Sequence, residues 1–406
     1  FASIQIHQHL RLVVMVQLCS ISAPARMPAV IKKPKIVKPA VIKAPKIIKV
    51  GTGFSTAVIK APKIIKVGTD FSGIDGSVTA LNRMFPYGKF RVIFGSDTNH
   101  DAHVMSAHMP GARPEKMYVD VNDRTPAKEK EDGPLDLYVT TPPCQPFSSA
   151  GNRHGVADAR GKLLSVSVKF IARCQPRCVV LENVKGFSTK KFASVKNGVT
   201  KALNGAGYEV HWQVLTSDNF QVPQKRARTF MVAIRKDCLR GDRKFRWPVA
   251  VTPKVNLKDA LDPPMVTDKP GRLPPGPKAK VLAKRAYKKA LLSGVNPLVT
   301  PISVDIDCSE KYQSNGVNIA NTLTRTRGGQ GGPWISSRGR RTSVSELIKI
   351  QGFKCTELPW VKAGLSASKI GMLLGNSVPV PMIGSVLSEA MYSAGITIEK
   401  VPFPKY

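Results

Sequence analysis

One cysteine has the surroundings expected of a reactive thiol. The segment TTPPCQPFS carries Cys144 directly after the apolar run LDLYVTT at 135–141. Two prolines fix the backbone in front of the thiol, and the thiolate form of cysteine is a nucleophile. A buried structural cysteine in a strand-to-loop turn is the alternative, and the flanking Pro, Gln and Ser residues make it the weaker one. The sequence therefore predicts a nucleophile at Cys144.

Two further segments bring polar or charged side chains to strand ends. In LENVKGF, Glu182 follows an apolar run, where a carboxyl group is expected to be paired or functional. In VPQKRARTF, Gln224, Arg226 and Arg228 alternate, so an extended segment would put them on one face. Three such donors suit an anionic or carbonyl-rich ligand. Taken singly, a cap or an ion pair explains Glu182, and a solvated edge strand explains the other segment.

Three turns complete the set of candidate segments: GTDFSGIDG at 68–76, GVADARGKL at 155–163 and GNSVPVP at 375–381. A glycine turn after a strand is weak evidence for a ligand site when it stands alone. Their value lies in their order along the chain.

These segments need a scaffold that brings strand ends together. Apolar, β-branched runs occur at 63–69, 90–96, 117–121, 136–141, 178–184, 209–216 and 229–235. Segments with helical character, such as 162–173 and 191–205, lie between most of them. This alternation predicts an α/β fold with a doubly wound, mostly parallel sheet. Such sheets bind ligands beyond the carboxyl ends of their strands.

Composition changes divide the chain into four predicted parts. They are a basic, Lys/Pro-rich and mostly disordered arm at 1–57, a catalytic domain at 58–247, a smaller inserted domain at 248–341, and a C-terminal segment at 342–406 that completes the catalytic domain. A tandem duplication, VIKAPKIIKVGTGFS followed by VIKAPKIIKVGTDFS, spans the first boundary. Only the second copy continues into the glycine turn, so we place that copy in the fold.

The charge balance indicates a polyanionic partner. Lys and Arg total 62 against 27 Asp and Glu, a formal net charge of +35. Nucleic acid is the first candidate, and an anionic membrane surface is the second. A membrane span is not expected, because no run of about eighteen apolar residues occurs. The seven cysteines match neither a disulfide framework nor zinc-site spacing, so we expect a reducing compartment and no metal.

In this order, the segments resemble the S-adenosylmethionine-dependent cytosine-5 DNA methyltransferase family. PPCQPFS is similar to its catalytic Pro-Cys motif, ENV to its Glu-Asn-Val motif, QKRAR to its Gln-x-Arg-x-Arg motif, and GNSV to its C-terminal Gly-Asn motif. RTSVSELIKIQGF resembles the segment that follows the family's recognition domain. The resemblance covers roughly residues 63–236 and 340–395. It implies a Rossmann-like methyltransferase fold with an inserted target-recognition domain.

The resemblance also implies a mechanism: methyl transfer from S-adenosylmethionine to carbon 5 of cytosine in DNA, through a covalent adduct of Cys144. Glu182 would contact ring nitrogen 3, and Arg228 the carbonyl at ring position 2, with Arg226 as a further catalytic residue. A base in duplex DNA would first leave the stack.

Further contacts follow from the same resemblance. The implied cofactor-binding residues are Phe71, Ser72, Gly73, Asp97, Asp120, Pro143, Leu163, Asn376 and Ser377. Two of these acids, Asp97 and Asp120, also fit turn or cap positions. The candidate DNA contacts are Gln224, Arg325, Arg327, Arg338, Arg340 and Arg341, with Trp334 as a stacking or wedging residue. Any single arginine is more simply explained as a contact to the DNA backbone.

Two departures from the family pattern keep other functions open. The first motif has Thr69 where the family has an acid, with the acid adjacent at Asp70, and it has Asp75 in place of a second glycine. These changes motivate a catalytically inactive DNA-binding or chromatin protein as one alternative. A tRNA cytosine-5 methyltransferase is the other, so RNA stays possible beside double-stranded DNA. Charge and substrate predict the nucleus in a eukaryote and the cytoplasm otherwise.

Overall fold

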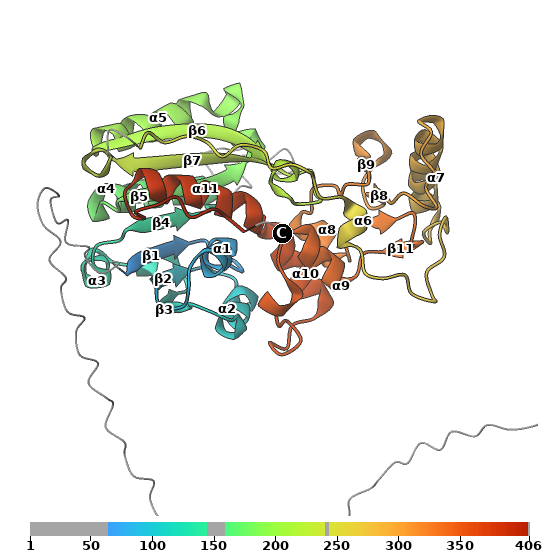
Figure 1. Cartoon of the computed structure of the whole chain (residues 1–406), viewed down its shortest axis with the longest axis horizontal. Coiled ribbons are helices and arrows are strands. Elements are labelled where there is room, and N and C mark those ends of the chain that lie inside the picture. The colour runs from blue at the N-terminus through green and yellow to red at the C-terminus, as the bar shows by residue number, and fades with distance from the viewer. Residues whose placement is uncertain (1–63, 144–158, 240–242, 405–406) are drawn as a thin grey trace, which may run out of the picture. The chain divides into compact units, whose positions relative to one another are not determined.

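The computed structural model describes residues 64–143, 159–239 and 243–404. Cys144 and the basic arm lie outside these ranges. A seven-stranded sheet in the order β3-β2-β1-β4-β5-β7-β6 forms the scaffold (Figure 1). The strands are β1 Ile65–Asp70, β2 Phe90–Ser96, β3 Pro114–Tyr118, β4 Leu137–Thr140, β5 Cys178–Val184, β6 Tyr208–Thr216 and β7 Ala227–Arg235. All neighbours pair in parallel except β7, which is antiparallel to β5 and β6. The predicted doubly wound, mostly parallel sheet is confirmed.

The apolar runs place most strands well, because each run is long enough to cross the sheet once. The runs at 90–96 and 178–184 coincide with β2 and β5. The run at 117–121 predicts the third strand three residues too late, since β3 spans Pro114–Tyr118. Asp120 ends the extended segment by capping the short helix η1, Val121–Asp123, where its side chain accepts from the Asn122 amide.

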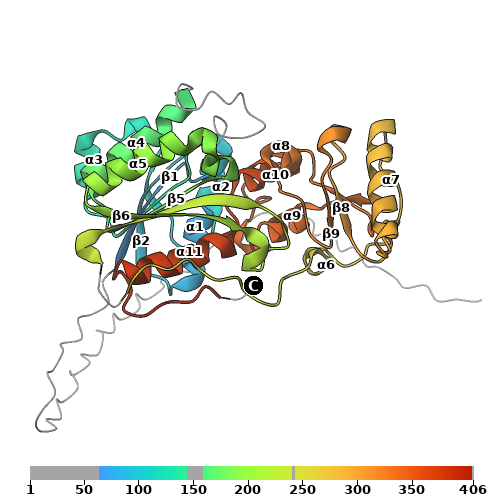
Figure 2. The same ribbon diagram turned by 90° about the horizontal axis from the view of Figure 1, so that it is seen from above.

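Helices cover both faces of the sheet, with α4 and α5 on one face and α1 and α11 on the other (Figure 2). The helices of this part of the chain are α1 Gly76–Met84, α2 His100–His108, α3 Pro126–Asp132, α4 Ala159–Cys174, α5 Ala193–Gly205, α9 Val344–Ile350, α10 Ala367–Asn376 and α11 Val380–Ser393. The C-terminal helix α11 packs against α1, so distant parts of the sequence share one core.

The segment Ala367–Ser393 is the one described stretch that is long and apolar enough to cross a membrane. It comprises α10 and α11, and 83% of its apolar window is buried inside the protein. Burial of that extent is typical of core helices, so this segment is weak evidence for a membrane span.

A second, four-stranded sheet in the order β11-β10-β8-β9 lies within the insert. Its strands are β8 Ile302–Val304, β9 Asn315–Val317, β10 Trp334–Ile335 and β11 Arg340–Arg341, accompanied by α6 Leu257–Ala260, α7 Pro277–Leu292 and α8 Arg325–Gly329. Trp334 is 5% exposed, and its indole N–H donates to the Tyr287 hydroxyl at 3.1 Å. A stacking or wedging role for Trp334 is therefore wrong, because its ring belongs to the core between α7 and the small sheet.

The Arg/Gly-rich segment RTRGG forms α8, which packs closely on α10. A Cβ atom added to Gly328 would lie 1.9 Å from the carbonyl oxygen of Gly371. A Cβ atom added to Gly371 would in turn lie 2.2 Å from the carbonyl oxygen of Gly328. These glycines therefore allow two helix backbones to touch, and part of the segment serves packing between α8 and α10.

We expect Trp334→Ala to lower the free energy of unfolding by about 3–5 kcal/mol, because it removes a large side chain from the small core. Urea unfolding of the full chain measures this change. Arg325→Ala, at an exposed position in α8, is the control and should change stability little. Unchanged stability of Trp334→Ala together with weaker DNA binding would instead restore the wedge interpretation.

Candidate active site

A buried ion pair lies under the carboxyl end of β1. The Arg124 guanidinium donates to both carboxylate oxygens of Asp70, at 2.8 and 2.6 Å, and both side chains are 1% exposed. The carboxylate also accepts from the hydroxyls of Ser96 at 2.7 Å and Tyr138 at 2.5 Å. Four donors thus converge on one carboxylate, which offsets much of the cost of burying its charge.

Arg124 is also held between aromatic rings. Its guanidinium carbon lies 4.1 Å from the ring centroids of both Phe94 and Phe170. Burial alone would lower the pKa of Arg124, but the hydrogen bonds and charge of Asp70 outweigh it and raise that pKa. Burial also raises the pKa of Tyr138, and the Asp70 charge adds to the rise. The guanidinium stays charged and the phenol neutral.

This network fixes the ends of neighbouring elements relative to one another. Asp70 and Ser96 are the last residues of β1 and β2, Tyr138 lies in β4, and Arg124 directly follows η1. The predicted cofactor-binding residues come next to these same ends, at 71–73, 97, 120 and 143. The switch in strand order, between β1 and β4, is where sheets of this kind bind ligands.

The first glycine turn takes up an unusual backbone at this point. Phe71 and Gly73 have φ values of 56° and 53°. The Ser72 amide donates to the Ser96 carbonyl oxygen at 2.9 Å, and the Gly73 amide donates to Asp97 Oδ2 at 2.8 Å. Apart from its chain neighbours, no atom of the described residues lies within 4 Å of a Cβ added to Gly73, so the turn borders open space in this part of the protein. Asp97, which also accepts from the Asn99 amide, presents carboxylate oxygens beside it.

These residues fit the group that the sequence implies. Ribose hydroxyls are donors, and a half-buried carboxylate such as Asp97 can accept from them. The Asp120 carboxylate accepts from the backbone and side-chain amides of Asn122 at 2.8 Å, so it also has the cap role considered above. At the C-terminal motif Asn376 is exposed, whereas the Ser377 hydroxyl donates to the Leu374 carbonyl oxygen. Leu163 and Pro143 are half-buried.

The two departures from the family pattern lie together. Asp75 has a φ of 40°, the left-handed conformation that a glycine adopts easily, and it caps α1 by accepting from the Val78 amide at 3.0 Å. Burial raises the pKa of Asp75, while hydrogen bonds from Ser77, the Val78 amide and Thr69 partly oppose the rise. Asp75 thus adds a buried carboxyl group to the same turn. We conclude that this turn keeps a carboxylate at its base.

A second charged pair stands at the end of β5. Arg228 Nε lies 2.9 Å from Glu182 Oε1, and the two side chains are 11% and 10% exposed. Burial raises the pKa of Glu182, against the lowering effect of the charges of Arg228 and Arg226. Within the described residues, Glu182 Oε2 and Arg228 Nη2 make no hydrogen bond. One acceptor and one donor therefore remain for a planar polar ligand.

The loop that leads to Cys144 is tied to this pair. Thr140, at the end of β4, pairs with Leu181, the residue before Glu182. The Asn183 side-chain amide donates to the Pro142 carbonyl oxygen at 3.4 Å. The chain thus leaves β4 next to Glu182. Cys144 follows two residues after Pro142 in the sequence.

Two residues of the QKRAR segment have other partners than predicted. Gln224 is fully buried, where its amide accepts from the Leu323 N–H and donates to Ile350 O and Gln351 Oε1. A DNA contact from Gln224 is therefore wrong, since its side chain joins the insert to α9. The Arg226 guanidinium donates to the carbonyl oxygens of Leu323, Gly375 and Ser377. We correct its catalytic role to that of a positioning residue that holds the GNSV turn.

Most arginines assigned to DNA contacts are held by acids of this chain. Arg327 pairs with Asp305, Arg338 and Arg340 with Asp268, Arg340 also with Glu346, and Arg341 with Asp307. Arg338 and Arg340 are 15% and 20% exposed and have acidic partners within the protein, and their DNA contacts stay a prediction. The pair of Arg340 and Glu346, at 2.8 Å, joins β11 to α9. Arg325 is exposed and stays a candidate for phosphate.

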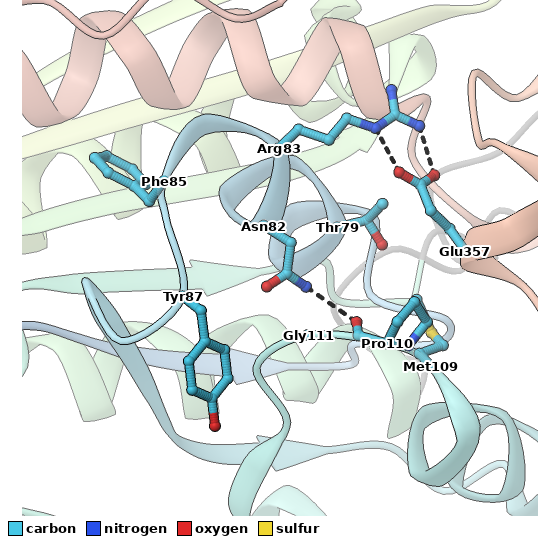
Figure 3. Close-up of a pocket in the computed structure, with 9 residues that line it drawn as sticks. All are labelled: Thr79, Asn82, Arg83, Phe85, Tyr87, Met109, Pro110, Gly111 and Glu357. Atoms are coloured by element: carbon cyan, nitrogen blue, oxygen red, sulfur yellow. Dashed lines mark hydrogen bonds and ion pairs between the residues drawn. The ribbon is translucent and has the colours of Figure 1, made fainter.

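A separate hollow of about 240 Å³ opens at the C-terminal end of α1 (Figure 3). Residues of α1, the loop after α2, and Glu357 line it. Arg83 pairs with Glu357 at 2.6 Å, and the Asn82 side-chain amide donates to the Pro110 carbonyl oxygen at 3.4 Å. None of the predicted site residues lines this hollow, so we assign it no part in the chemistry.

Comparisons with known proteins agree with this geometry. The family model described as C-5 cytosine-specific DNA methylase matches residues 66–391. The chain belongs to this family, and its members use S-adenosylmethionine as the methyl donor. The predicted family is thereby confirmed.

Three curated relatives from bacteria are named type II methyltransferases. The type II methyltransferase M.HaeII of Haemophilus aegyptius is 27% identical over 287 residues, which cover 71% of this chain and 82% of the relative. M.HhaI of Haemophilus parahaemolyticus is 25% identical over 304 residues, 72% of this chain and 84% of the relative. The match to M.Sau96I of Staphylococcus aureus, 36% identical, is shorter and covers 31% of this chain and 30% of the relative.

Solved structures share the fold. The Dnmt2 methyltransferase of S. pombe has a TM-score of 0.56 at 18% identity, over 81% of this chain and 98% of that one. A putative DNA modification methyltransferase encoded within an E. coli prophage has a TM-score of 0.56 at 18% identity, over 82% of this chain and 100% of that one. At such identities the likeness shows the Rossmann-like fold alone.

We expect Asp70→Asn to lower the free energy of unfolding by about 3–5 kcal/mol, because Arg124 would stay buried without its counter-charge. The double variant Asp70→Leu/Arg124→Met should lose less than the combined losses of its two single variants, Asp70→Leu and Arg124→Met, since it buries no unpaired charge. Urea unfolding of the wild type, these two single variants and the double variant measures the coupling. Additive losses would contradict the account, and Glu115→Gln, in the exposed pair with Arg91, is the control.

Proposed function

We propose that this protein transfers a methyl group from S-adenosylmethionine to carbon 5 of cytosine in DNA, with Cys144 as the nucleophile. The pair of Glu182 and Arg228 carries this proposal. The pair lies at the carboxyl end of β5, beside the loop that leads to Cys144, and among the described residues Glu182 Oε2 and Arg228 Nη2 make no hydrogen bond. The cytosine carbonyl can accept from the guanidinium, and ring nitrogen 3 can pair with the carboxyl group when one of the two carries a proton.

The chain's own residues would act on the ring as follows. The Cys144 thiolate adds to carbon 6, which makes carbon 5 electron-rich. Arg228 donates to the carbonyl at ring position 2, and Glu182 hydrogen-bonds or protonates ring nitrogen 3. The raised pKa of Glu182 suits a carboxyl group that shares a proton with the ring. Once carbon 5 has been methylated and has lost its proton, Cys144 leaves and the aromatic ring is restored.

The cofactor would be held at the β1 and β2 ends. S-adenosylmethionine supplies an electrophilic methyl group when bound. The turn Phe71–Gly73 would border its methionine part, and Asp97 would accept from its ribose hydroxyls. Asp120, Pro143, Leu163, Asn376 and Ser377 complete the proposed contacts. Their order around the switch point between β1 and β4 supports this assignment.

DNA is the substrate that the comparisons favour over tRNA or an inactive binding role. The family description names DNA, and the reported curated relatives are type II methyltransferases. Thr69 and Asp75, which motivated an inactive protein, together keep a carboxylate at the turn. The reported relatives are bacterial and lend no support to a nuclear location, which stays a prediction.

A label-transfer assay tests the proposal. The full chain is incubated with S-adenosylmethionine carrying a tritiated methyl group and with genomic DNA or tRNA, so that many target sequences are offered. We expect label in DNA as 5-methylcytosine, none after Cys144→Ser, and a decrease of about 10²- to 10³-fold for Glu182→Gln. Glu131→Gln, at an exposed position, is the matched control. Label in tRNA alone, or label that survives Cys144→Ser, would contradict the proposal.

A further inference from the structure

The outer face of α7, the helix that packs on the small sheet, is strongly cationic. The helix Pro277–Leu292 has sixteen residues, six of them basic and none acidic. All six basic side chains are exposed: Lys278, Lys280, Lys284, Arg285, Lys288 and Lys289. The opposite face, with Ala283, Ala286, Tyr287 and Ala290, is buried against the small sheet. One side of α7 therefore anchors the helix, and the other presents only positive charge among its ionisable groups.

Nothing in the described chain neutralises this face. Arg285 lies 3.9 Å from Glu310, and both side chains are more than half exposed. The five lysines have no acidic group within 4 Å among the described residues. Arg327, Arg338 and Arg340 differ from these lysines, because each of them has an acidic partner within the protein.

The spacing of these charges works against the helix. Lys280, Lys284 and Lys288 repeat every four residues, and like charges at that spacing repel one another along a helix face. Lys278 and Lys280 lie in the first turn, where the helix dipole disfavours positive charge and where no acid is present. This repulsion lowers the stability of α7 when nothing is bound, and a polyanion beside the helix would remove it.

We infer that the exposed face of α7 is a docking surface for the phosphate backbone of double-stranded DNA. This inference rests on the proposed function, which supplies DNA as the polyanion. Lysines on flexible stems contact phosphates as point charges and read no base sequence, so α7 adds affinity and leaves target choice to other residues.

A membrane surface fits this helix poorly. A helix that lies in a membrane interface needs a free apolar face, and the apolar face of α7 is buried beneath Trp334 and β8. The exposed apolar residues Val281, Leu291 and Leu292 do not make a second such face, because Leu291 and Leu292 stand together at the helix end. Duplex DNA needs only the cationic face.

The test neutralises one stripe of the helix. The triple variant Lys280→Gln/Lys284→Gln/Lys288→Gln of the full chain is compared with the wild type for binding to duplex DNA, without S-adenosylmethionine, over a range of salt concentrations. Each phosphate contact contributes a slope of about 0.9 in a plot of log affinity against log salt. We expect the slope of the variant to be shallower by about 1–3 and its thermal stability to be unchanged or higher.

The matched control removes the same charge elsewhere. Lys190→Gln/Lys191→Gln/Lys201→Gln alters three exposed lysines at and near α5, and the slope should keep its wild-type value. Equal slopes for the α7 variant and the wild type would overturn the inference, as would equal losses in both triple variants. A loss seen with single-stranded RNA or anionic vesicles and not with duplex DNA would also overturn it.

Binding and catalysis separate the two proposals. Methyl transfer at saturating DNA should be unchanged in the α7 variant, because no cytosine-contacting residue is altered. A wild-type chain that binds DNA through α7 and transfers no methyl group supports this inference and contradicts the proposed function. If the wild-type chain methylates DNA and the α7 variant has the same salt slope as the wild type, the proposed function is supported and this inference is contradicted.

Discussion

The buried ion pair of Asp70 and Arg124 is the contact on which the candidate active site depends. It joins β1 to β2, to β4 and to the turn after β3, because Ser96, Tyr138 and Arg124 all donate to the carboxylate of Asp70 at the end of β1. Charges removed from water are tolerated only where hydrogen bonds replace hydration. The strand ends therefore cannot separate without exposing or orphaning a charge, and the proposed cofactor contacts keep a fixed spacing.

The ion pairs Asp70–Arg124 and Glu182–Arg228 differ in exposure and in the number of hydrogen bonds that they already make. Asp70 has four donors and lies 1% exposed, so it has little capacity left for a ligand. Glu182 and Arg228 are about ten times more exposed and retain an unused acceptor and donor. The pair of Asp70 and Arg124 holds the strand ends in place, and the pair of Glu182 and Arg228 would present polar atoms to the cytosine ring. Asp70, which follows the departure at Thr69, is thus structural.

The sequence predicted the scaffold closely and the partners of individual side chains less well. Runs such as Cys178–Val184 cross the sheet once, so apolar length alone defines them. Alternation predicts that Arg226 and Arg228 share one face, but it cannot tell whether a polar group points to solvent or to a buried carbonyl. Arg124 went unnoticed because it lies in the polar stretch DVNDRTPA, and only the fold brings it under Asp70. Trp334 was misassigned because aromatic residues serve cores as readily as DNA.

Covalent trapping tests the central claim most directly. Duplex DNA that carries 5-fluorocytosine at its target sites is incubated with the full chain and S-adenosylmethionine, beside an RNA of matching sequence and the Cys144→Ser variant. Fluorine at carbon 5 prevents the proton loss that releases the enzyme, so the account predicts a stable protein–DNA adduct that requires Cys144. An adduct on RNA alone, or an equal adduct with Cys144→Ser, would contradict it.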